Sequence, residues 1–385
     1  MDYAATTPLD PRVFEAMEPY FCEVYGNASS INTFGLEAKQ ALEDARKTIA
    51  GLMDAQPEEL VFTGSATEAN NLALKGFAFR KGKTETHIAI SAIEHDSVLN
   101  AAKWLERRGF QIKAIPVDTS GLLDLGELEN ALGNGASLVS VIHANNEIGT
   151  IQPINEIAEL CHEYGACFHT DAAQSFGKIP IDAREMSIDL LTINAHKIYG
   201  PKGVGALFIR KGVKIEPLLH GGGHEFGLRS GTENVPGIIG FARAVELREE
   251  EMESEKRRLT KLGSELVEGA LHIEEAYLNG HPTERLPNIN NFRFSHIEGE
   301  SLVLLLNDKG IAASTGSACS SRSLEPSHVL LAIGLKHEEA HGSLRLSLGK
   351  YNTEEDIDYI LEVLPGAVER LRSISPLGRR STPNG

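Results

Sequence analysis

Two side chains of opposite charge follow two apolar runs in the middle of the chain. The run Ala166–Thr170 ends in Asp171, and the run Ile188–Ile193 is followed closely by Lys197. Both runs are short and rich in residues typical of buried strands. If the two strands are parallel neighbours, Asp171 and Lys197 lie at carboxyl ends, where open α/β sheets bind ligands. The sequence therefore predicts that an acid and an amine meet at one edge of a sheet.

An acid and an amine in this arrangement have the chemistry of a pyridoxal phosphate (PLP) site. The lysine supplies a Schiff base, and the aspartate keeps the pyridine nitrogen protonated so that the ring can act as an electron sink. Taken singly, the two residues also have ordinary interpretations. A lysine beside a Gly/Pro-rich turn is usually a solvated surface residue, and an aspartate after a strand is usually a helix cap. The prediction therefore depends on the residues that accompany them.

The segment from Glu59 to Phe79 has the pattern strand, small polar loop, helix. The strand Glu59–Thr63 leads into Gly64–Glu68 and then into the helical pattern Ala69–Phe79. Free backbone N–H groups and the positive end of the helix dipole would face such a loop, which suits a phosphate group. A capping box with Ser65 or Thr67 as the cap explains the same residues without a ligand. The residues alone leave both interpretations open.

Strands alternate with helices from about residue 59 to residue 209, which favours a mainly parallel sheet with helices on both faces. Polar residues recur directly after the ends of the predicted strands. A shared site at one edge of the sheet explains this recurrence, whereas a purely structural interpretation does not predict it. These residues are Thr67, His95, Asn146, Asp171 and Lys197.

The remainder of the chain predicts a second, smaller α/β unit. A long charged helix at 235–268 is interpreted as a solvated connector that leads into it. The predicted domains are a large one at 13–250 and a small one made of 1–12 and 251–375. The tail 376–385 is expected to be disordered. Near the start, one helix is predicted over 13–25.

The composition limits the class of protein. The chain has 385 residues with a formal net charge of -17, so a nucleic acid is a poor default partner. No run of apolar residues is long enough to span a bilayer, and no leader is recognisable, so we expect no membrane partner and a cytoplasmic location. The four cysteines fit neither a disulfide framework nor a zinc spacing, and no metal site is predicted. Cys22, Cys161 and Cys167 are expected to be small buried hydrophobes.

The sequence closely resembles cysteine desulfurases of the NifS/IscS type, which are class V aminotransferase relatives and fold-type I PLP enzymes. The resemblance extends to about Ser375, and nine motifs in family order carry it. These motifs are DYAATTP, TGSATEANN, EHDSV, HANNEIGTIQP, HTDAAQSFGK, HKIYGPKGVGAL, HGGGHEFGLRSGT, STGSACSS and SLRLSLG. The resemblance implies a large domain with a mainly parallel seven-stranded sheet between helices, and a smaller α/β C-terminal domain that carries the Cys319 loop.

The resemblance also implies roles for individual residues. Lys197 carries PLP, Asp171 pairs with the pyridine nitrogen, and His95 stacks on the ring and shuttles protons. Arg345 binds the substrate carboxylate in a bidentate manner, with Asn146 beside it. Thr232 holds the phosphate in the other subunit of a homodimer. The full set of residues that hold the phosphate and the phenolic oxygen of the ring is Ala66, Thr67, Asn146, Gln174, Asn194, His196 and Thr232.

The implied reaction removes sulfur from L-cysteine. Cys319, as its thiolate, takes the substrate sulfur as a persulfide, and alanine is released. An IscU-type iron–sulfur scaffold and tRNA-thiolation proteins are the implied acceptors, and Cys319 could transiently ligate a cluster in a scaffold complex. The alternatives on the same fold are a selenocysteine lyase and an aminotransferase, and the latter would not need Cys319. A non-catalytic partner protein is disfavoured by the intact set of Lys197, Asp171, Arg345 and Cys319.

Two departures from the family pattern bear on the site. Asn194 stands where the family usually has serine, which keeps hydrogen-bonding ability but adds bulk near the phosphate. Only Met1 precedes Asp2, where the family usually has further residues that begin a strand, so the sequence leaves open whether an N-terminal strand forms.

Overall fold

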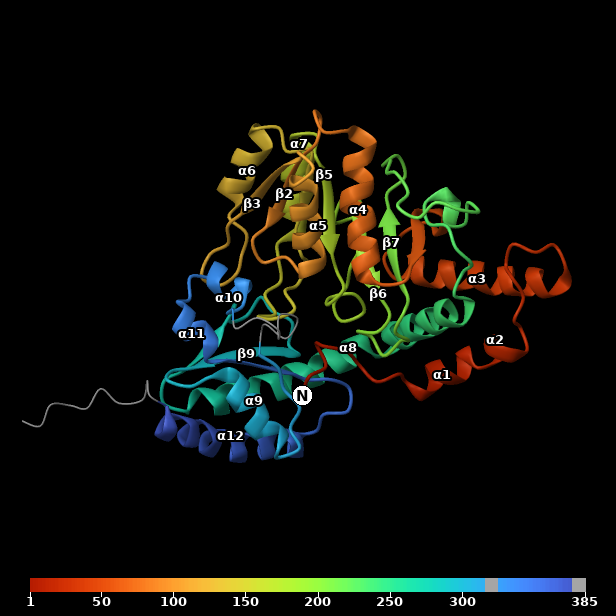
Figure 1. The fold of residues 1–385 in the computed structure, drawn as a ribbon. Helices are drawn as coiled ribbons and strands as arrows, with labels where there is room; N and C mark the ends of the chain where they lie inside the picture. Colours follow the sequence, from red (N-terminus) through yellow and green to blue (C-terminus); the bar gives the residue numbers. More distant parts are fainter. Residues whose placement is uncertain (316–324, 376–385) are drawn as a thin grey trace, which may run out of the picture.

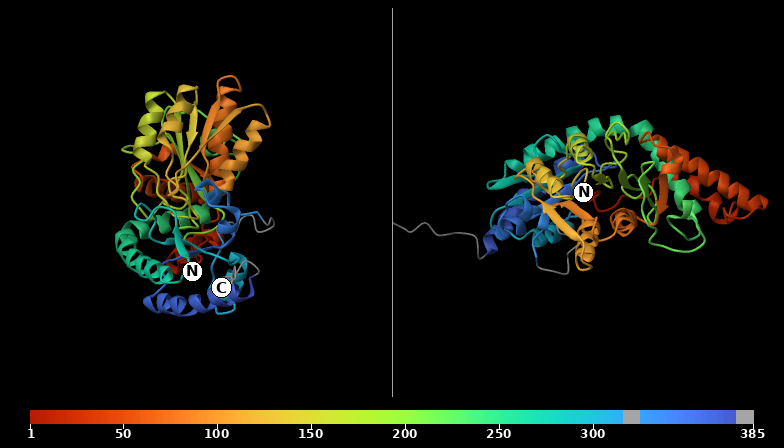
Figure 2. Two further views of the ribbon diagram at one scale, coloured as in Figure 1. Left: turned by 90° about the vertical axis from the view of Figure 1, so that its left-hand side faces the viewer. Right: turned by 90° about the horizontal axis from the view of Figure 1, so that it is seen from above.

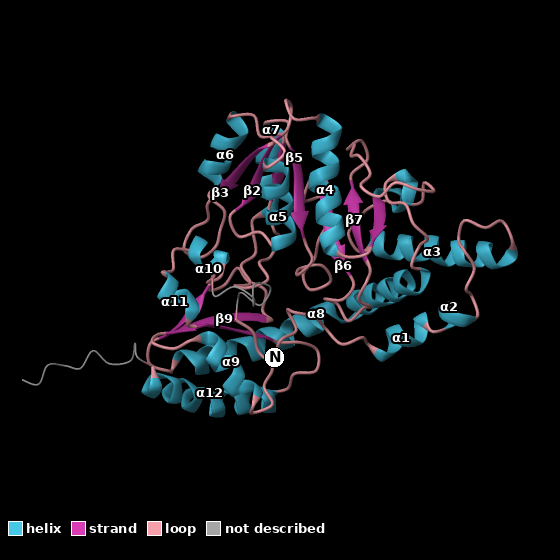
Figure 3. Cartoon of the chain, in the orientation of Figure 1, coloured by secondary structure: helices cyan, strands magenta, loops and turns pink. Residues whose placement is uncertain are grey.

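The structure is a computed structural model that describes residues 1–315 and 325–375. Cys319 and the expected tail at 376–385 lie outside the described residues. The chain forms a seven-stranded sheet flanked by helices and a separate three-stranded sheet (Figures 1 and 3). The predicted α/β class is therefore confirmed. None of the described helices is both long and apolar enough to cross a membrane.

The strands form the two sheets, and the helices flank them. In chain order they are α1 (Pro11–Met17), α2 (Pro19–Cys22), α3 (Thr33–Gly51), η1 (Pro57–Glu59), β1 (Leu60–Thr63), α4 (Ala66–Lys81), β2 (His87–Ser91), α5 (Asp96–Glu106), β3 (Gln111–Ile115), α6 (Leu125–Gly133), β4 (Leu138–Ser140), α7 (Ile154–Glu163), β5 (Cys167–Asp171), β6 (Leu190–Asn194), β7 (Gly205–Ile209), η2 (Glu225–Gly227), α8 (Val235–Leu271), β8 (Ala276–Asn279), β9 (Ile289–Phe294), α9 (Gly299–Asn307), α10 (His328–Ala332), α11 (His337–His341), β10 (Ser343–Ser347) and α12 (Glu354–Ile374).

The large sheet has the strand order β1-β7-β6-β5-β4-β2-β3. Its strands β3, β2, β4, β5 and β6 run parallel, while β7 is antiparallel to both of its neighbours. The central strands β5 and β6 are parallel neighbours, as the sequence predicts, with Asp171 paired to Thr192. The carboxyl end of β5 and the segment after β6 therefore lie at the same edge of the sheet.

The small sheet has the order β10-β9-β8 and is antiparallel. The N-terminal segment joins it at β10, since Asp2 forms a parallel bridge with Ser347, and the backbone N–H of Tyr3 donates to the carbonyl of Ser347 at 3.2 Å. The chain thus begins with a single bridge in place of a full strand. Asp2 and Ser347, which are far apart in the sequence, are therefore neighbours at the edge of the small sheet.

Helix α8 is a structural part of both halves, which corrects its interpretation as a solvated connector. Its first half, from Val235 to Leu247, packs into the core under the large sheet. Its second half, from Leu259 to Ala270, packs into the core of the small sheet with α12. Figure 2 shows α8 running along both parts. The domain division at residue 250 stays a prediction, because α8 passes through it without a break.

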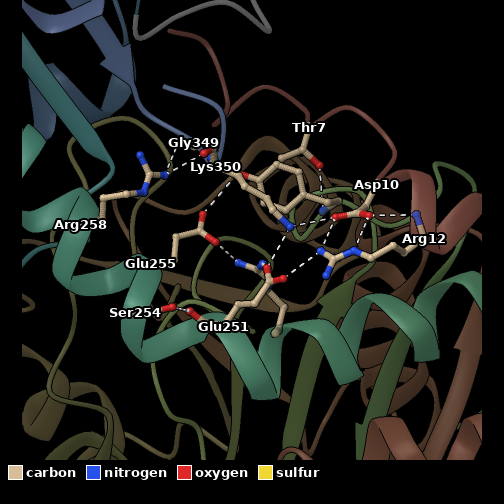
Figure 4. Close-up of polar contacts among 11 residues, drawn as sticks. Thr7, Asp10, Arg12, Glu251, Ser254, Glu255, Arg258, Gly349 and Lys350 are labelled. Carbon is tan, nitrogen blue, oxygen red and sulfur yellow. Dashed lines mark hydrogen bonds and ion pairs between the residues drawn. The ribbon is translucent and has the colours of Figure 1, made fainter. Parts of the chain in front are cut away.

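Charged side chains bind the N-terminal segment, α8 and the loop after β10 together (Figure 4). The ammonium group of Lys350 donates to Asp10 and to Glu251, each at 2.9 Å. Arg12 also bridges these two acids, at 2.8 Å from each. This network fixes the start of the chain against α8. Within it, the hydrogen bond from Arg12 holds the pKa of the Asp10 carboxyl below its ordinary value.

Two further expectations are wrong in detail. The helix expected over 13–25 is divided at Pro19, because proline lacks the N–H that would continue the first helix. Cys161 is buried as expected and Cys167 is partly buried, whereas Cys22 is exposed.

Candidate active site

One cavity of about 600 Å³ opens at the carboxyl edge of the large sheet. Its volume is within the range of small-molecule sites. The walls come from the N-terminal segment, the start of α4, the segments after β2, β4, β5 and β6, and β10. The predicted site residues that line it are Ala66, Thr67, His95, Asn146, Asp171, Gln174, Asn194, His196, Lys197 and Arg345.

One predicted residue lies elsewhere, and another is not described. Thr232 is exposed and is absent from the lining of this cavity, so it does not contact the site of its own chain. Cys319 lies outside the described residues. The residues directly after its segment, Glu325 to His328, do line the cavity.

Asp171 ends β5 and is buried in the wall of the cavity. Its Oδ1 accepts the backbone N–H of Ala173 at 2.9 Å, and its Oδ2 accepts the side-chain Nδ2 of Asn70 at 2.7 Å. A carboxylate offers about four acceptor positions, so it retains the capacity to accept a further N–H from a ligand. The position after a buried strand explains why the sequence predicted this residue.

Lys197 is partly buried and faces the first residues of the chain. Its Nζ donates to the carbonyl oxygen of Ala5 at 2.7 Å and to that of Ala4. The side-chain Nε2 of Gln174 donates to the same Ala4 carbonyl at 2.9 Å. The N-terminal segment therefore organises the amine, a contribution that sequence reasoning missed, because no local pattern links residues almost 200 positions apart.

A second buried amine lies behind this group. The Nζ of Lys178 donates to Oε1 of Gln174 at 3.2 Å. Burial, with a smaller contribution from the charge of Lys197, lowers the pKa of Lys178 to about 7. Lys178 thus holds the amide of Gln174 from behind, while Gln174 faces the cavity.

His196 closes the same side of the cavity. Its Nδ1 is 3.1 Å from the hydroxyl of Thr6, and its backbone carbonyl accepts from the N–H and the hydroxyl of Thr7. Burial, with smaller contributions from Lys197 and Lys202, lowers the pKa of His196 to about 4. Its ring is therefore neutral near pH 7.

Helix α4 begins at the cavity. Ser65 caps it, because its hydroxyl accepts the N–H of Glu68 at 3.1 Å. Ser65 is therefore the cap, but the Glu68 carboxylate accepts the N–H of Gly64 at 2.8 Å in place of the reciprocal contact of a capping box. This cap is compatible with a ligand, since Ala66 and Thr67 of the first turn line the cavity. Asn194 lies in the same wall, buried at the end of β6, and its Oδ1 has no hydrogen-bond partner in the described part of the chain.

Arg345 lies on β10 at the opposite side of the cavity and is buried. Its NH1 donates to the carbonyl of Asn146 at 2.8 Å, and its NH2 donates to Oδ1 of Asp2 at 3.1 Å. Its Nε has no partner within the described residues. A buried guanidinium with donors to spare is suited to a ligand carboxylate. Its Asp2 partner was not anticipated from the sequence.

Two buried acids stand beside the cavity. Burial raises the pKa of Glu147 to about 7, and the hydroxyl of Ser327 donates to its Oε2 at 2.5 Å. Burial also raises the pKa of Glu94, whose Oε1 accepts the N–H of Ile142 at 2.6 Å. Glu147 thereby ties the segment before α10 to the loop that follows β4.

These residues fit PLP. Asp171 retains acceptor capacity for a ring N–H, the first turn of α4 offers backbone donors for a phosphate, and Asn194 has an amide that is not saturated by the protein. Lys197 brings an amine to the space between them. The group would supply an electron sink when bound.

Comparison with known proteins agrees with this fit. Residues 1–360 match the class-V aminotransferase family. The chain is 55% identical over 379 residues to cysteine desulfurase IscS 1 of Archaeoglobus fulgidus, covering 98% of this chain and 99% of that protein. It is 54% identical to cysteine desulfurase IscS of Methanosarcina thermophila, covering 98% and 93%.

Solved structures agree as well. A NifS-like protein superposes with a TM-score of 0.90 at 41% identity, covering 97% of this chain and 99% of the other. SspA in complex with cysteine superposes with a TM-score of 0.81 at 37% identity, covering 91% and 99%. The chain belongs to the class-V aminotransferase family, in its NifS/IscS branch of PLP-dependent cysteine desulfurases.

Proposed function

We propose that this chain removes sulfur from L-cysteine with Lys197, Asp171 and Arg345 as its central groups and Cys319 as the first sulfur acceptor. The observation that carries the proposal is the convergence of the first three side chains on one cavity. Arg345 binds the substrate carboxylate, Asp171 accepts a hydrogen bond from the coenzyme nitrogen, and the amine of Lys197 holds the coenzyme and moves the α-proton of the substrate. The remaining lining residues hold the phosphate and the ring.

The overall reaction balances without an external oxidant. The Cys319 thiolate forms an S–S bond with the sulfur of cysteine as the Cβ–S bond breaks, and the carbon fragment takes up protons and leaves as L-alanine. The products are alanine and a persulfide on Cys319. A sulfur nucleophile attacks readily as the thiolate, so its proton must leave first.

The test is an assay of alanine and persulfide with the purified, PLP-loaded protein and L-cysteine. We expect Lys197→Ala to abolish both products and Cys319→Ser to abolish persulfide and alanine turnover. Cys22→Ser is the matched control, because Cys22 is an exposed free thiol, and it should keep full activity. Sulfur release by Cys319→Ser at the wild-type rate would refute the proposal.

A homodimer is part of the proposal. Large apolar side chains stand exposed on the segment from α2 to the start of α3, among them Phe21, Tyr25 and Ile31, with Ile31 95% exposed. This segment projects from the body of the chain in Figures 1 and 2. Apolar surface gathered in this way marks an interface. A second copy that covers it could also receive the exposed Thr232 near its coenzyme phosphate.

Subunit mixing tests this arrangement. Lys197→Ala and Thr232→Ala should each impair the homodimer. A heterodimer of the two variants has one intact site only if Thr232 acts across the interface, so mixing should restore activity. No restoration in a demonstrated heterodimer would place Thr232 outside the partner's site.

The final acceptor belongs to the same proposal. IscS relatives at about 50% identity over the full chain support sulfur transfer to an IscU-type scaffold for iron–sulfur cluster assembly in the cytoplasm. Transfer of radiolabelled sulfur from Cys319 to a purified scaffold protein is the measurement that tests it.

A further inference from the structure

A buried hydrogen-bonded chain connects Asp171 with His95. The amide Nδ2 of Asn70, in α4, is 2.7 Å from Oδ2 of Asp171 and 2.8 Å from the hydroxyl of Ser97. The Ser97 hydroxyl is 2.8 Å from Nδ1 of His95, and the backbone N–H of Ser97 donates to the same Nδ1 at 3.1 Å. Asn70 is fully buried, and Ser97 is nearly so.

The direction of each hydrogen bond follows from the groups involved. A carboxylate can only accept, so Asn70 must turn its NH₂ group toward Asp171. The second hydrogen of that NH₂ group is then donated to the oxygen of Ser97. A backbone N–H can only donate, so Nδ1 of His95 must be an unprotonated acceptor. The Ser97 hydroxyl therefore donates its own hydrogen to Nδ1.

The orientation of Asn70 carries a cost that points to a role. Its Oδ1 is buried and has no hydrogen-bond partner in the described part of the chain. A buried acceptor without a partner destabilises the folded chain, because it has lost its contacts with water. An amide that served only the packing of α4 would satisfy both of its ends. Instead, both hydrogens of the Asn70 NH₂ group are donated within the chain of hydrogen bonds that runs from Asp171 to His95.

We propose that Asn70 and Ser97 are positioning residues that hold His95 as the tautomer with its proton on Nε2. The proposal rests on the proposed function, which places the coenzyme beside Asp171 and His95. The ring of His95 lines the cavity. His95 therefore donates a hydrogen bond from Nε2 to groups bound in the cavity. The side chains of Asn70 and Ser97 link the Asp171 carboxylate to this tautomer.

The proposal changes the role expected for His95. With its hydrogen on Nε2, a neutral His95 cannot take the thiol proton of Cys319 or of the substrate at that nitrogen. Its other nitrogen already accepts two hydrogen bonds from Ser97. His95 thus orients and donates, and the thiol proton goes to another group.

The experiment measures the ring nitrogens directly. The full-length protein, loaded with PLP, is labelled with ¹⁵N in its histidine rings, and His95→Gln identifies the His95 resonances by their loss. We expect an unprotonated Nδ1 and a protonated Nε2, and the same pattern in the protein without PLP. A protonated Nδ1 in the wild-type protein would overturn the proposal.

A substitution tests the relay. In Ser97→Ala, the hydroxyl that donates to Nδ1 of His95 is lost, while the backbone N–H of that residue still donates to the same nitrogen. We expect the Nδ1-protonated fraction of His95 to rise, and kcat to fall about tenfold, the equivalent of one hydrogen bond, with KM for cysteine nearly unchanged. An unchanged tautomer ratio in the folded variant would overturn the proposal.

A matched control makes the same serine-to-alanine change beside another buried histidine and separates this effect from general damage. Ser140→Ala removes an equivalent serine–histidine contact, of 2.8 Å to His169, and should shift only His169. Activity retained by Lys197→Ala would refute the proposed function but leave these spectra as predicted.

Discussion

The contacts of Arg345 show why its side-chain type matters. Two of its nitrogens are held by Asn146 and Asp2, which fixes the plane of the guanidinium. A lysine at this position has a single point charge and cannot present two parallel donors to a carboxylate. The geometry, and not only the charge, therefore supports substrate binding.

We expect Arg345→Lys to raise KM for cysteine by about tenfold or more, since a charge-assisted hydrogen bond contributes about 1.5–3 kcal/mol. The fall in kcat should be smaller. Steady-state kinetics with L-cysteine measure both constants. Arg293→Lys, on the adjacent strand β9, is the control and should leave KM unchanged. An unaltered KM in Arg345→Lys would place the substrate carboxylate elsewhere.

His169 makes the stability of the fold sensitive to acid. It lies in β5, between the hydroxyls of Ser140 and Thr192. Burial lowers the pKa of its ring from 6.5 to about 3. Between these two pH values the unfolded chain binds a proton that the folded chain does not, so stability falls as the pH falls below about 6.5.

The variant His169→Asn lacks this proton uptake. We expect the wild type to lose about 2 kcal/mol relative to this variant between pH 7.5 and pH 5, at 1.36 kcal/mol per pH unit below 6.5. Urea unfolding of both proteins at the two pH values gives the difference. Equal losses in the two proteins would show that His169 is already protonated in the folded state.

Some residues of the site could be predicted from the sequence around them, and others could not. Asp171 and Lys197 could be predicted because each follows a buried strand. Asp2 and Ala4 could not, since their contacts with Arg345 and Lys197 join distant parts of the chain without a pattern that marks them. Asn70 was missed because a buried amide inside a helix carries no signal of its partners.

At the scale of elements, the loop before α8 is anchored by one buried carboxylate. Glu225 is held by two nitrogens of Arg46, each at 2.8 Å, and accepts the backbone N–H of Phe62 at 2.7 Å. Glu225 and Phe226 both have positive φ angles, a conformation that is unfavourable for these residue types. The buried contacts must outweigh that strain, and they position the segment that leads to Thr232.

We therefore expect Glu225→Ala to destabilise the protein by about 3–5 kcal/mol, because it leaves the buried Arg46 charge without its partner. Glu216→Ala removes an exposed ion pair, with Arg80 at 3.1 Å, and should cost about 1 kcal/mol or less. Chemical denaturation compares the two. Similar losses for both variants would mean that the Arg46–Glu225 pair contributes no more than a surface contact.

Long elements were easier to predict than short ones. The helix predicted at 235–268 is found as α8, because many residues contribute to its periodic pattern. The short β8 and α11 were missed, since four or five residues carry too little periodicity. The role of α8 was misjudged for a different reason: its charged middle suggested a solvated connector, whereas its two ends enter different cores.

At the scale of the whole molecule, α8 couples the two sheets. Its 37 residues extend about 55 Å at 1.5 Å per residue. The network of Asp10, Arg12, Glu251 and Lys350 binds the same helix to the start of the chain (Figure 4). Opening one half would therefore disturb the packing of the other.

We expect a single cooperative unfolding transition, although chains of this length often unfold through intermediates. The one tryptophan, Trp104 in α5, reports on the large sheet by its fluorescence, and circular dichroism reports on all helices. The two curves should coincide. In Glu250→Pro, which breaks α8 at an exposed position, they should separate, while Glu250→Ala should behave like the wild type. Separate transitions in the wild type would contradict the coupling.

The pairing of Asp2 with Arg345 and of the N-terminal segment with β10 has a consequence for biosynthesis. The two partners are 343 residues apart, so a ribosome must synthesise all of the intervening residues before either can meet the other. A nascent chain with a folded large sheet would still lack the wall that holds the substrate carboxylate. Catalytic competence thus arrives late in translation, and incomplete products truncated before β10 remain inert toward cysteine.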